Sequence, residues 1–474
     1  MKSIIHGNLE VTLRGRLAQR ESQGRLRHLA TPVPDLVDFS SNDYLSLSQD
    51  PIVHKALITQ LNDPNKETSL ASSNGRAIGS GGSRLLDGNS TFVEQLERKI
   101  SNFHNSEAAL LFSSAYDANV GLISCVPGAK DTILYDNLIH ASIHDGMRLS
   151  RAAKTIPFAH ESIIRHARKS DVELEKGGSS IAAKESQGLE RTLRQMIHND
   201  RRVRSGESNV FICVEALYSM DGDIADLQYV SDVVQSLLPN RNGYIIVDEA
   251  HSIGVLGNGR GLVCQLGLQS RIWARVVGFG KAMGCAGGGI LCSSIARLYL
   301  INYARTLIYT TAMSFPSLAS INTVYDYMIF GETEKHRQQL QILIQHCHVK
   351  LRCLYKRFRP ATAELRVPNG PSSSPIIPLF TRHPKSLARH CQMFGFMIRP
   401  IVAPTVPQGQ ERIRICIHAS NTIEQIDSLF QAIETWLGNL GAKRDIGTQG
   451  KSQTGDTSEV VLQNGPRKNI ESKL

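Results

Sequence analysis

An acidic residue and a lysine each follow an apolar segment of this 474-residue chain. Asp248 ends the run Gly-Tyr-Ile-Ile-Val-Asp, and Lys281 stands in a glycine-rich turn just beyond a second apolar run, 274–278. Such a lysine can form a Schiff base with an aldehyde cofactor, and such an acid can keep a pyridine nitrogen protonated so that the ring accepts electrons. Taken singly, Asp248 suits a helix N-cap and Lys281 an ordinary loop. Together they indicate a pyridoxal 5'-phosphate (PLP) site at the carboxyl ends of strands.

Apolar runs at regular intervals predict the strands that position these two residues. The runs lie at 108–112, 132–135, 154–157, 210–214, 244–247, 274–278 and 289–292, with helical segments between them. This alternation predicts an α/β fold in which a large, mostly parallel sheet is covered by helices. A helix is expected to begin near Thr91, with Thr91 and Glu94 as a capping box.

Shifts in composition divide the chain into parts. We expect residues 1–60 to contribute to a small domain, 61–330 to form the large PLP-binding domain, and 331–440 to form a small C-terminal α+β domain. A long amphipathic helical region is predicted from about Pro316 to residue 358. The polar stretch 165–190 is predicted to be an inserted surface loop. Residues 441–474 contain almost no core-forming side chains and are predicted to be disordered.

The net charge of +10 is spread along the chain. Nucleic-acid binding would need a basic stripe with stacking aromatics, so no such partner is expected. No run of about twenty apolar residues predicts a membrane span, and the first residues lack the apolar core of a secretory signal. The nine cysteines include no C-x-x-C pair, and no His/Cys cluster has zinc spacing, so we expect reduced thiols and no metal.

The last three residues predict a location. Ser472-Lys473-Leu474 is the peroxisomal import address when it stands at a free carboxyl terminus. We therefore expect import into the peroxisome through its receptor, and a cytoplasmic location otherwise.

Eight motifs in one order resemble the α-oxoamine synthases, PLP-dependent enzymes of fold type I. They are Phe39-Ser-Ser-Asn42-Asp-Tyr-Leu, Gly79-Ser-Gly-Gly-Ser-Arg84, Asp136 to Ser142, Tyr218-Ser219-Met-Asp-Gly-Asp223, Asp248-Glu-Ala-His251-Ser, Gly280-Lys281-Ala, Ile308-Tyr-Thr-Thr311, and Arg399 to Pro407. The resemblance covers residues 25–435 apart from the insertion. It implies the decarboxylative condensation of an amino acid with an acyl-CoA. The nearest likeness within the family implies L-alanine and pimeloyl-CoA, giving 8-amino-7-oxononanoate, CoA and CO₂ in biotin biosynthesis.

The resemblance also implies roles for single residues. Lys281 would carry the cofactor and move the Cα proton, Asp248 would pair with the pyridine nitrogen, and His140 would stack on the ring; these three are the implied catalytic residues. The implied cofactor-binding set is Ala115, Tyr116, His140, Ser219, Asp248, His251, Gly278, Lys281 and Thr311, and the implied substrate-binding set is Arg27, Asn42, Thr405 and Arg414. The family builds its site at a homodimer interface, where Thr310 or Thr311 would reach the neighbouring subunit's phosphate.

Simpler roles stay open for several of these residues. His140 could be an ordinary histidine at a strand end, Ser219 could cap the turn that follows it, and Arg412 competes with Arg414 for the substrate carboxylate. The family usually has threonine or serine where this chain has Gly278, so a hydrogen bond to the phosphate, worth about 1.5–3 kcal/mol, is expected to be missing. It also usually has Gly-Phe where this chain has Ala115-Tyr116.

Three other functions are compatible with parts of the pattern. One is the same reaction with another acyl thioester or amino acid in secondary metabolism. Another is an aminotransferase on the same fold, which the Ser-Met-Asp-Gly-Asp and Pro-Thr-Val-Pro runs argue against. The third is a catalytically weak partner subunit, which the presence of Lys281 argues against.

Overall fold

The computed structural model describes residues 7–29, 31, 35–62, 78–164, 187–358, 365–366 and 373–449. The chain divides into two compact units, Val37–Ala442 and a second unit of Met1–Leu36 with Lys443–Leu474. Most of the predicted insertion, 165–186, and the last tripeptide lie outside the described residues. The insertion, the import signal and the predicted domain limits therefore stay predictions.

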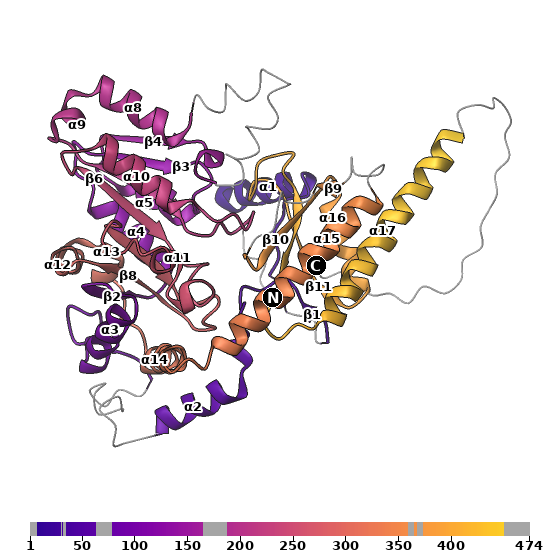
Figure 1. Cartoon of the computed structure of the whole chain (residues 1–474), viewed down its shortest axis with the longest axis horizontal. Coiled ribbons are helices and arrows are strands. Elements are labelled where there is room, and N and C mark those ends of the chain that lie inside the picture. The colour runs from indigo at the N-terminus through magenta and orange to yellow at the C-terminus, as the bar shows by residue number, and fades with distance from the viewer. Residues whose placement is uncertain are drawn as a thin grey trace. The chain divides into compact units, whose positions relative to one another are not determined.

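Seven strands form the main sheet, in the order β2-β8-β7-β6-β5-β3-β4 (Figure 1). The strands are β2 (Ala108–Phe112), β3 (Thr132–Asp136), β4 (Lys154–Phe158), β5 (Val210–Glu215), β6 (Gly243–Asp248), β7 (Ala274–Gly278) and β8 (Gly288–Cys292). The ladders that join β7, β6, β5, β3 and β4 are parallel, whereas β8 runs antiparallel to both of its neighbours. The mostly parallel sheet and its strands are confirmed.

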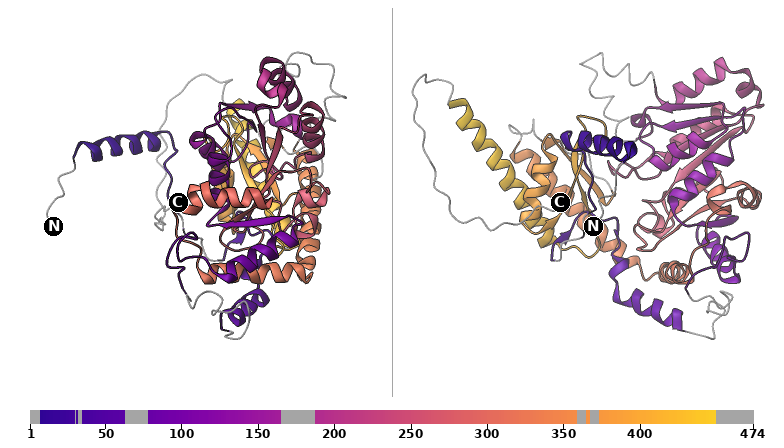
Figure 2. Two further views of the ribbon diagram at one scale, coloured as in Figure 1. Left: turned by 90° about the vertical axis from the view of Figure 1, so that its left-hand side faces the viewer. Right: turned by 180° about the vertical axis from the view of Figure 1, so that it is seen from behind.

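Side chains that alternate along the inner strands are buried on both faces of this sheet, whereas the edge strand β4 is largely exposed. On β6, Ile246 packs with helices α4, α5, α12 and α13, and the next residue, Val247, packs with α3, α8, α10, α11 and α14. Figure 2 shows these helices on the two sides of the sheet. The helices are α3 (Thr91–Phe103), α4 (Ala115–Cys125), α5 (Ala141–Leu149), α8 (Leu189–Asn199), α9 (Arg201–Ser205), α10 (Leu227–Leu237), α11 (Leu262–Gln265), α12 (Ser294–Tyr303), α13 (Arg305–Ile308) and α14 (Phe315–Ile329).

A smaller antiparallel sheet has the strand order β12-β13-β10-β9. It is formed by β9 (Leu365–Arg366), β10 (Ile376–Thr381), β12 (Arg399–Ile401) and β13 (Arg412–Cys416). The early strand β1 (Val37–Asp38) pairs in parallel with β11 (Phe396–Met397), so residues near the start of the chain lie against its C-terminal part. The remaining helices are α1 (Asn8–Ser22), α2 (Pro51–Asn62), α15 (Glu334–Arg357), α16 (Pro384–Met393) and α17 (Ile423–Gln449), with short 3₁₀ helices η1 (Leu47–Gln49), η3 (His160–Ile163) and η4 (Gly257–Gly259).

Helix limits differ from prediction in three places. The N-cap of α3 is Ser90 and not Thr91, because the Ser90 hydroxyl accepts the Val93 N–H, while the Glu94 carboxylate accepts from Asn89 (2.8 Å). The region after Pro316 is two helices, α14 and α15, separated at Gly331, whose φ of 79° glycine adopts without steric cost.

The third difference concerns the C-terminal segment. Helix α17 continues to Gln449, into the segment 441–474 that was predicted to be disordered. Extending an existing helix needs no new nucleus, so good helix formers such as Ala442, Lys443 and Arg444 can prolong it without a core to bury.

Among the described helices, none is both long and apolar enough to cross a membrane.

We predict that Gly288→Ala destabilises the fold. A Cβ at this position would lie 2.3 Å from the Ala115 nitrogen and 2.6 Å from its Cα, so the start of α4 would have to move. Overpacking of this kind costs about 1–3 kcal/mol, to be measured by urea denaturation. The control is Gly438→Ala in α17, where no atom lies within 4 Å and helix propensity favours alanine by about 1 kcal/mol. Equal stabilities for the two variants would contradict this packing.

Candidate active site

Three carboxylates lie at the carboxyl ends of neighbouring strands. Asp136 ends β3, Glu215 ends β5 and Asp248 ends β6, and Glu215 is the ladder partner of Asp248. All three are buried. Burial, and then the neighbouring Asp248 charge, raise the pKa of Glu215 well above its usual range. This shift favours the protonated form of Glu215, which reduces the repulsion between the two neighbouring carboxyl groups.

Asp248 is held by two donors and has 6% of its surface exposed. Its Oδ1 accepts the Ala250 N–H (2.9 Å), and its Oδ2 accepts from the Asn119 amide (2.7 Å). These bonds fix the carboxylate plane and leave lone pairs for one further donor. A protonated ring nitrogen would be such a donor.

Lys281 lies three residues beyond β7, in a turn closed by the Gly284 N–H bonding to its carbonyl (2.8 Å). Its side chain is half-buried. Burial lowers the pKa of Lys281 and nearby Arg414 lowers it further, while Asp248 and Glu215 oppose the shift. A lowered pKa gives more neutral amine, which is the nucleophilic and proton-accepting form.

His140 is the N-cap of α5. Its Nδ1 accepts the Ser142 N–H (3.2 Å) and lies 2.8 Å from the Ser142 hydroxyl. The Tyr116 ring meets the imidazole edge-on, with centroids 6.2 Å apart. Burial lowers the pKa of His140; Asp248 opposes this and Lys281 adds to it. The imidazole is thus neutral, and it lies close enough to Asp248 and Lys281 for both to influence its pKa.

The start of α4 is the predicted binding site for the phosphate group of the cofactor. The Ser114 hydroxyl accepts the Asp117 N–H, and the first N–H that bonds within the helix is that of Ala118, to Ser114 O (3.0 Å). The N–H groups of Ala115 and Tyr116 precede it, as in any helix N-terminus that binds phosphate.

Gly278 lies against this helix start, and the space beside it is taken. A Cβ at 278 would lie 2.8 Å from the Ala250 Cβ and 3.2 Å from the Ala115 Cβ. The two predicted departures from the family pattern therefore lie side by side, and the methyl groups of Ala250 and Ala115 together occupy the volume that a side chain at 278 would need. A hydroxyl from position 278 cannot be added here without a shift of its neighbours.

Arg414, on β13, is held by carbonyl oxygens. Its guanidinium donates to Ser219 O (2.9 Å), Ser40 O (3.4 Å) and Asn42 Oδ1 (3.1 Å). Its competitor Arg412 is already engaged: it forms an ion pair with Asp221 and lies over the Phe380 ring, 4.4 Å from the centroid. Arg414, whose bonded partners are neutral, is the better placed of the two to bind a substrate carboxylate.

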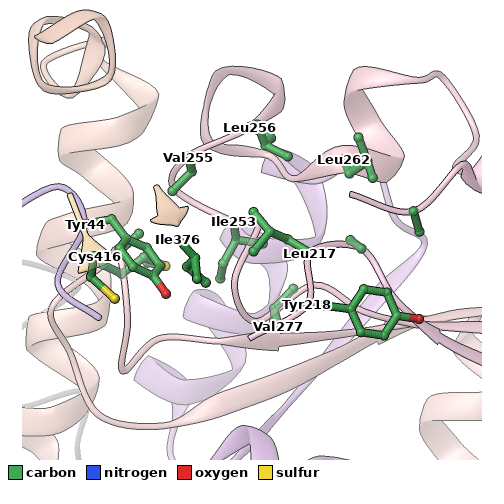
Figure 3. Packing of buried hydrophobic residues seen from close by; sticks show 14 of the residues in the cluster. Tyr44, Leu217, Tyr218, Ile253, Val255, Leu256, Leu262, Val277, Ile376 and Cys416 are labelled. Carbon is green, nitrogen blue, oxygen red and sulfur yellow. The ribbon is translucent and has the colours of Figure 1, made fainter. Parts of the chain in front are cut away.

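A buried tyrosine joins the substrate side to the cofactor side. The Tyr44 hydroxyl lies 2.8 Å from His251 Nδ1 and donates to Asn42 Oδ1 (3.1 Å), which also accepts from Arg414. Figure 3 shows Tyr44 beside Cys416 of β13. Burial lowers the pKa of His251 well below its usual range, and the nearby Lys281 charge lowers it further. His251 is therefore neutral.

Asp136, one of the three carboxylates, is paired with a buried histidine cation, His160. His160 Nδ1 is 2.8 Å from Asp136 Oδ2, and its Nε2 is 3.3 Å from Asp223 Oδ2. The Tyr218 hydroxyl also donates to Asp136 (2.9 Å). Burial alone would lower the pKa of His160, but the bonds to Asp136 and Asp223 raise it to about 10. This ion cluster ties the turn at 219–223, whose Ser219 carbonyl holds Arg414, to the main sheet.

The other predicted site residues are less informative. The half-buried Ser219 meets Arg414 through its carbonyl, and Thr405 and Thr311 are exposed. Arg27 belongs to the second compact unit. Roles for Arg27, Thr405 and Thr311 stay predictions, as does the absence of a metal, although no group of three or more potential ligand residues was found among the described residues.

Several site residues were missed. Glu215 follows an apolar strand just as Asp248 does, so the same signal could have found it. Asn119 is a single amide in the apolar stretch of α4, a pattern that predicts a buried hydrogen-bonding role. Tyr44 belongs to the motif that begins at Phe39, but the motif implied no role for it. No local sequence pattern links Tyr44 to His251.

The arrangement fits PLP. Asp248 would hold the ring nitrogen, His251 the phenolic oxygen, Lys281 the aldehyde carbon, and the N–H groups at the start of α4 the phosphate. The expected hydroxyl at position 278 is missing, because Ala250 and Ala115 leave no room for a side chain there.

Comparisons with known proteins agree with this geometry. The family model described as aminotransferase class I and II matches residues 34–433. The chain is 44% identical to 8-amino-7-oxononanoate synthase of Emericella nidulans over 91% of this chain and 97% of that one. It is 32% identical to the aminoacyl transferase sphA of Byssochlamys spectabilis, over 88% of this chain and 84% of that one. Among solved structures, serine palmitoyltransferase of Sphingomonas wittichii superposes with a TM-score of 0.70 at 22% identity, covering 92% and 99% of the two chains; at that identity the likeness concerns the fold.

We predict that Gly278→Ala lowers the thermal unfolding midpoint and the retention of PLP, because the added methyl group meets Ala250 and Ala115. Adding Ala115→Gly should restore part of both losses, since it removes one of the two contacts. Differential scanning fluorimetry and PLP absorbance after dialysis give the two measurements. If the effects of the two substitutions on the unfolding midpoint were strictly additive, positions 278 and 115 would not compete for the same space.

We also predict that stability falls as pH rises from about 6.5 to about 10. His160 keeps its proton up to about 10 in the folded protein, whereas an unfolded histidine loses it near 6.5. The folded state therefore binds more protons in this window, and the free energy of unfolding decreases with pH. His160→Gln should flatten that slope in urea denaturation at pH 7, 8 and 9. An unchanged slope would mean that His160 is neutral in the folded protein.

Proposed function

Because the chain belongs to the class I and II aminotransferase family, whose cofactor is PLP, we propose that it condenses L-alanine with pimeloyl-CoA to give 8-amino-7-oxononanoate, CoA and CO₂. The observation that carries this proposal is the proximity of three groups. Lys281, an amine with a lowered pKa, and Asp248, a fixed carboxylate, lie at the edge of the main sheet, and Arg414, an arginine bonded to neutral partners, approaches Lys281 from β13 of the smaller sheet.

When bound, PLP supplies an aldehyde that takes up the substrate amino group and a ring that accepts electrons from the Cα atom. The residues of this chain do the rest. Arg414 binds the carboxylate of the amino acid and orients the Cα–H bond. Lys281, as a neutral amine, accepts the Cα proton and later returns one. Asp248 keeps the proton on the ring nitrogen, so the ring stays an electron acceptor.

The choice of substrates is supported by the relative from Emericella nidulans, at 44% identity over nearly its whole length. The relative named as an aminoacyl transferase, at 32% identity, supports the same chemistry on another substrate pair. We rank this second substrate pair below the first, because the chain is less similar to this relative (32% against 44% identity) and covers less of its length (84% against 97%).

Two parts of the proposal concern assembly and location. We propose a homodimer in which Thr310 or Thr311, which follow α13, reach the phosphate bound by the neighbouring copy. Several large apolar side chains near this segment are exposed, among them Tyr309 and Leu86, as a dimer interface requires. Import into the peroxisome stays a proposal of the same kind.

The deciding experiment is CoA release by purified, PLP-loaded protein given L-alanine and pimeloyl-CoA. We expect release that needs both substrates and is abolished in Lys281→Ala. PLP binding without release would overturn the substrate assignment and lead to a panel of acyl-CoAs and amino acids. Failure to bind PLP would overturn the proposed function as a whole.

We predict that Arg414→Ala raises KM for L-alanine about 10- to 100-fold, because a charge-assisted bond to the carboxylate is worth about 1.5–3 kcal/mol. KM for pimeloyl-CoA should change much less. The control in the same steady-state assay is Arg412→Ala. Arg412 lies on the same strand as Arg414 but forms an ion pair with Asp221. A larger KM effect at Arg412 would reverse the assignment.

A further inference from the structure

Asn119 connects two groups of the site that lie on different elements. It stands in α4 and has 1% of its surface exposed. Its amide nitrogen donates to Asp248 Oδ2 (2.7 Å) and to the Ser142 hydroxyl (3.0 Å). A charged carboxylate only accepts hydrogen bonds, so the amide nitrogen and not the amide oxygen must face Asp248. The orientation of Asn119 is therefore determined by the charge of Asp248.

The direction of the next bond follows from this orientation. Because the Ser142 oxygen receives a hydrogen from Asn119, its own hydrogen is free to point to its other close partner, His140 Nδ1, 2.8 Å away. The Ser142 backbone N–H points to the same nitrogen (3.2 Å). With two donors directed at it, Nδ1 must be the unprotonated nitrogen of the neutral imidazole, and Nε2 must carry the hydrogen.

We propose that Asn119 is a positioning residue that sets the tautomer of His140 from the charge of Asp248. In the resulting state His140 presents an Nε2–H donor and has no basic nitrogen to offer. His140 can then hydrogen-bond an acceptor such as the carboxylate of an amino acid, and the transfer of the Cα proton is left to Lys281. Only this use of the donor rests on the proposed function; the tautomer itself does not.

A buried asparagine elsewhere in the chain provides a matched control. Asn242 has 3% of its surface exposed, and its amide nitrogen also donates to two acceptors, the carbonyls of Val203 and Ser208. In both residues the amide oxygen is buried without a hydrogen-bond partner among the described residues. Asn242 immediately precedes β6, whereas Asp248 ends it, so the loss of Asn242 should cost similar stability without reaching His140.

The test is long-range ¹H–¹⁵N NMR of the histidine ring nitrogens in full-length, cofactor-free protein, with His140→Gln to assign the signals. Wild-type His140 should show an unprotonated Nδ1 and a protonated Nε2. In Asn119→Ala the Ser142 hydroxyl is free to accept as well as donate, so the His140 nitrogen shifts should move toward a mixture of tautomers. Asn242→Ala should leave them at their wild-type values.

Ser142→Ala provides a second variant in case Asn119→Ala does not fold. It keeps the backbone N–H but removes the hydroxyl donor, so it should also move the His140 shifts toward a mixture. A protonated Nδ1 in the wild type would overturn the proposal. Unchanged His140 shifts in whichever of the two variants folds would do so as well.

A kinetic measurement separates the tautomer from the proposed function. If the protein turns over L-alanine and pimeloyl-CoA, Asn119→Ala should lower kcat about tenfold or more, and Asn242→Ala should not. A shifted tautomer in a protein without turnover would sustain the inference and reject the substrates. Turnover at wild-type kcat in a folded Asn119→Ala variant would reject the positioning role.

Discussion

The chemistry of this site depends on how three carboxylates share one low-dielectric sheet edge. Like charges on neighbouring strands cannot all persist in the interior, because each loses its hydration and repels the next. The repulsion is relieved in a different way at each of the three acids. Asp136 is paired with the His160 cation, burial favours the protonated form of Glu215, and Asp248 accepts hydrogen bonds from two donors, the Ala250 N–H and the Asn119 amide. The ionised Asp248 in turn limits how far burial can lower the pKa of Lys281.

Much of this arrangement could be predicted from the sequence. Apolar runs predicted the inner strands of the main sheet, because a parallel sheet buried on both faces needs near-continuous apolar segments; the edge strand β4 was also predicted, although it is largely exposed. The position of Asp248 and Lys281 just after such runs predicted that they lie at the same edge. The resemblance supplied roles that spacing alone could not, such as that of His251.

What could not be predicted is set by tertiary contacts. The bond from Tyr44 to His251 spans 207 positions and that from Asn42 to Arg414 spans 372, and no local pattern encodes either. The capping box at Thr91 failed because the preceding serine, itself a favoured N-cap residue, takes the N-cap position. The lack of room for a side chain at Gly278 could not be predicted either, because the methyl groups that fill the space belong to Ala250 and Ala115, which are distant in sequence.

The pairing of β1 with β11 has a consequence for the order in which the site is assembled during synthesis. Apart from Thr311, which would serve the neighbouring copy, the groups expected to hold the cofactor belong to one continuous stretch of chain, from Ala115 to Lys281. Asn42 and Tyr44 are made early but are held by partners made late: Phe39 O accepts the Cys416 N–H and Tyr44 O accepts the Ala419 N–H. A ribosome-bound chain would thus complete its cofactor half first. The amino-acid half can close only after β13 has left the ribosome, so substrate recognition is the last property that the nascent protein acquires.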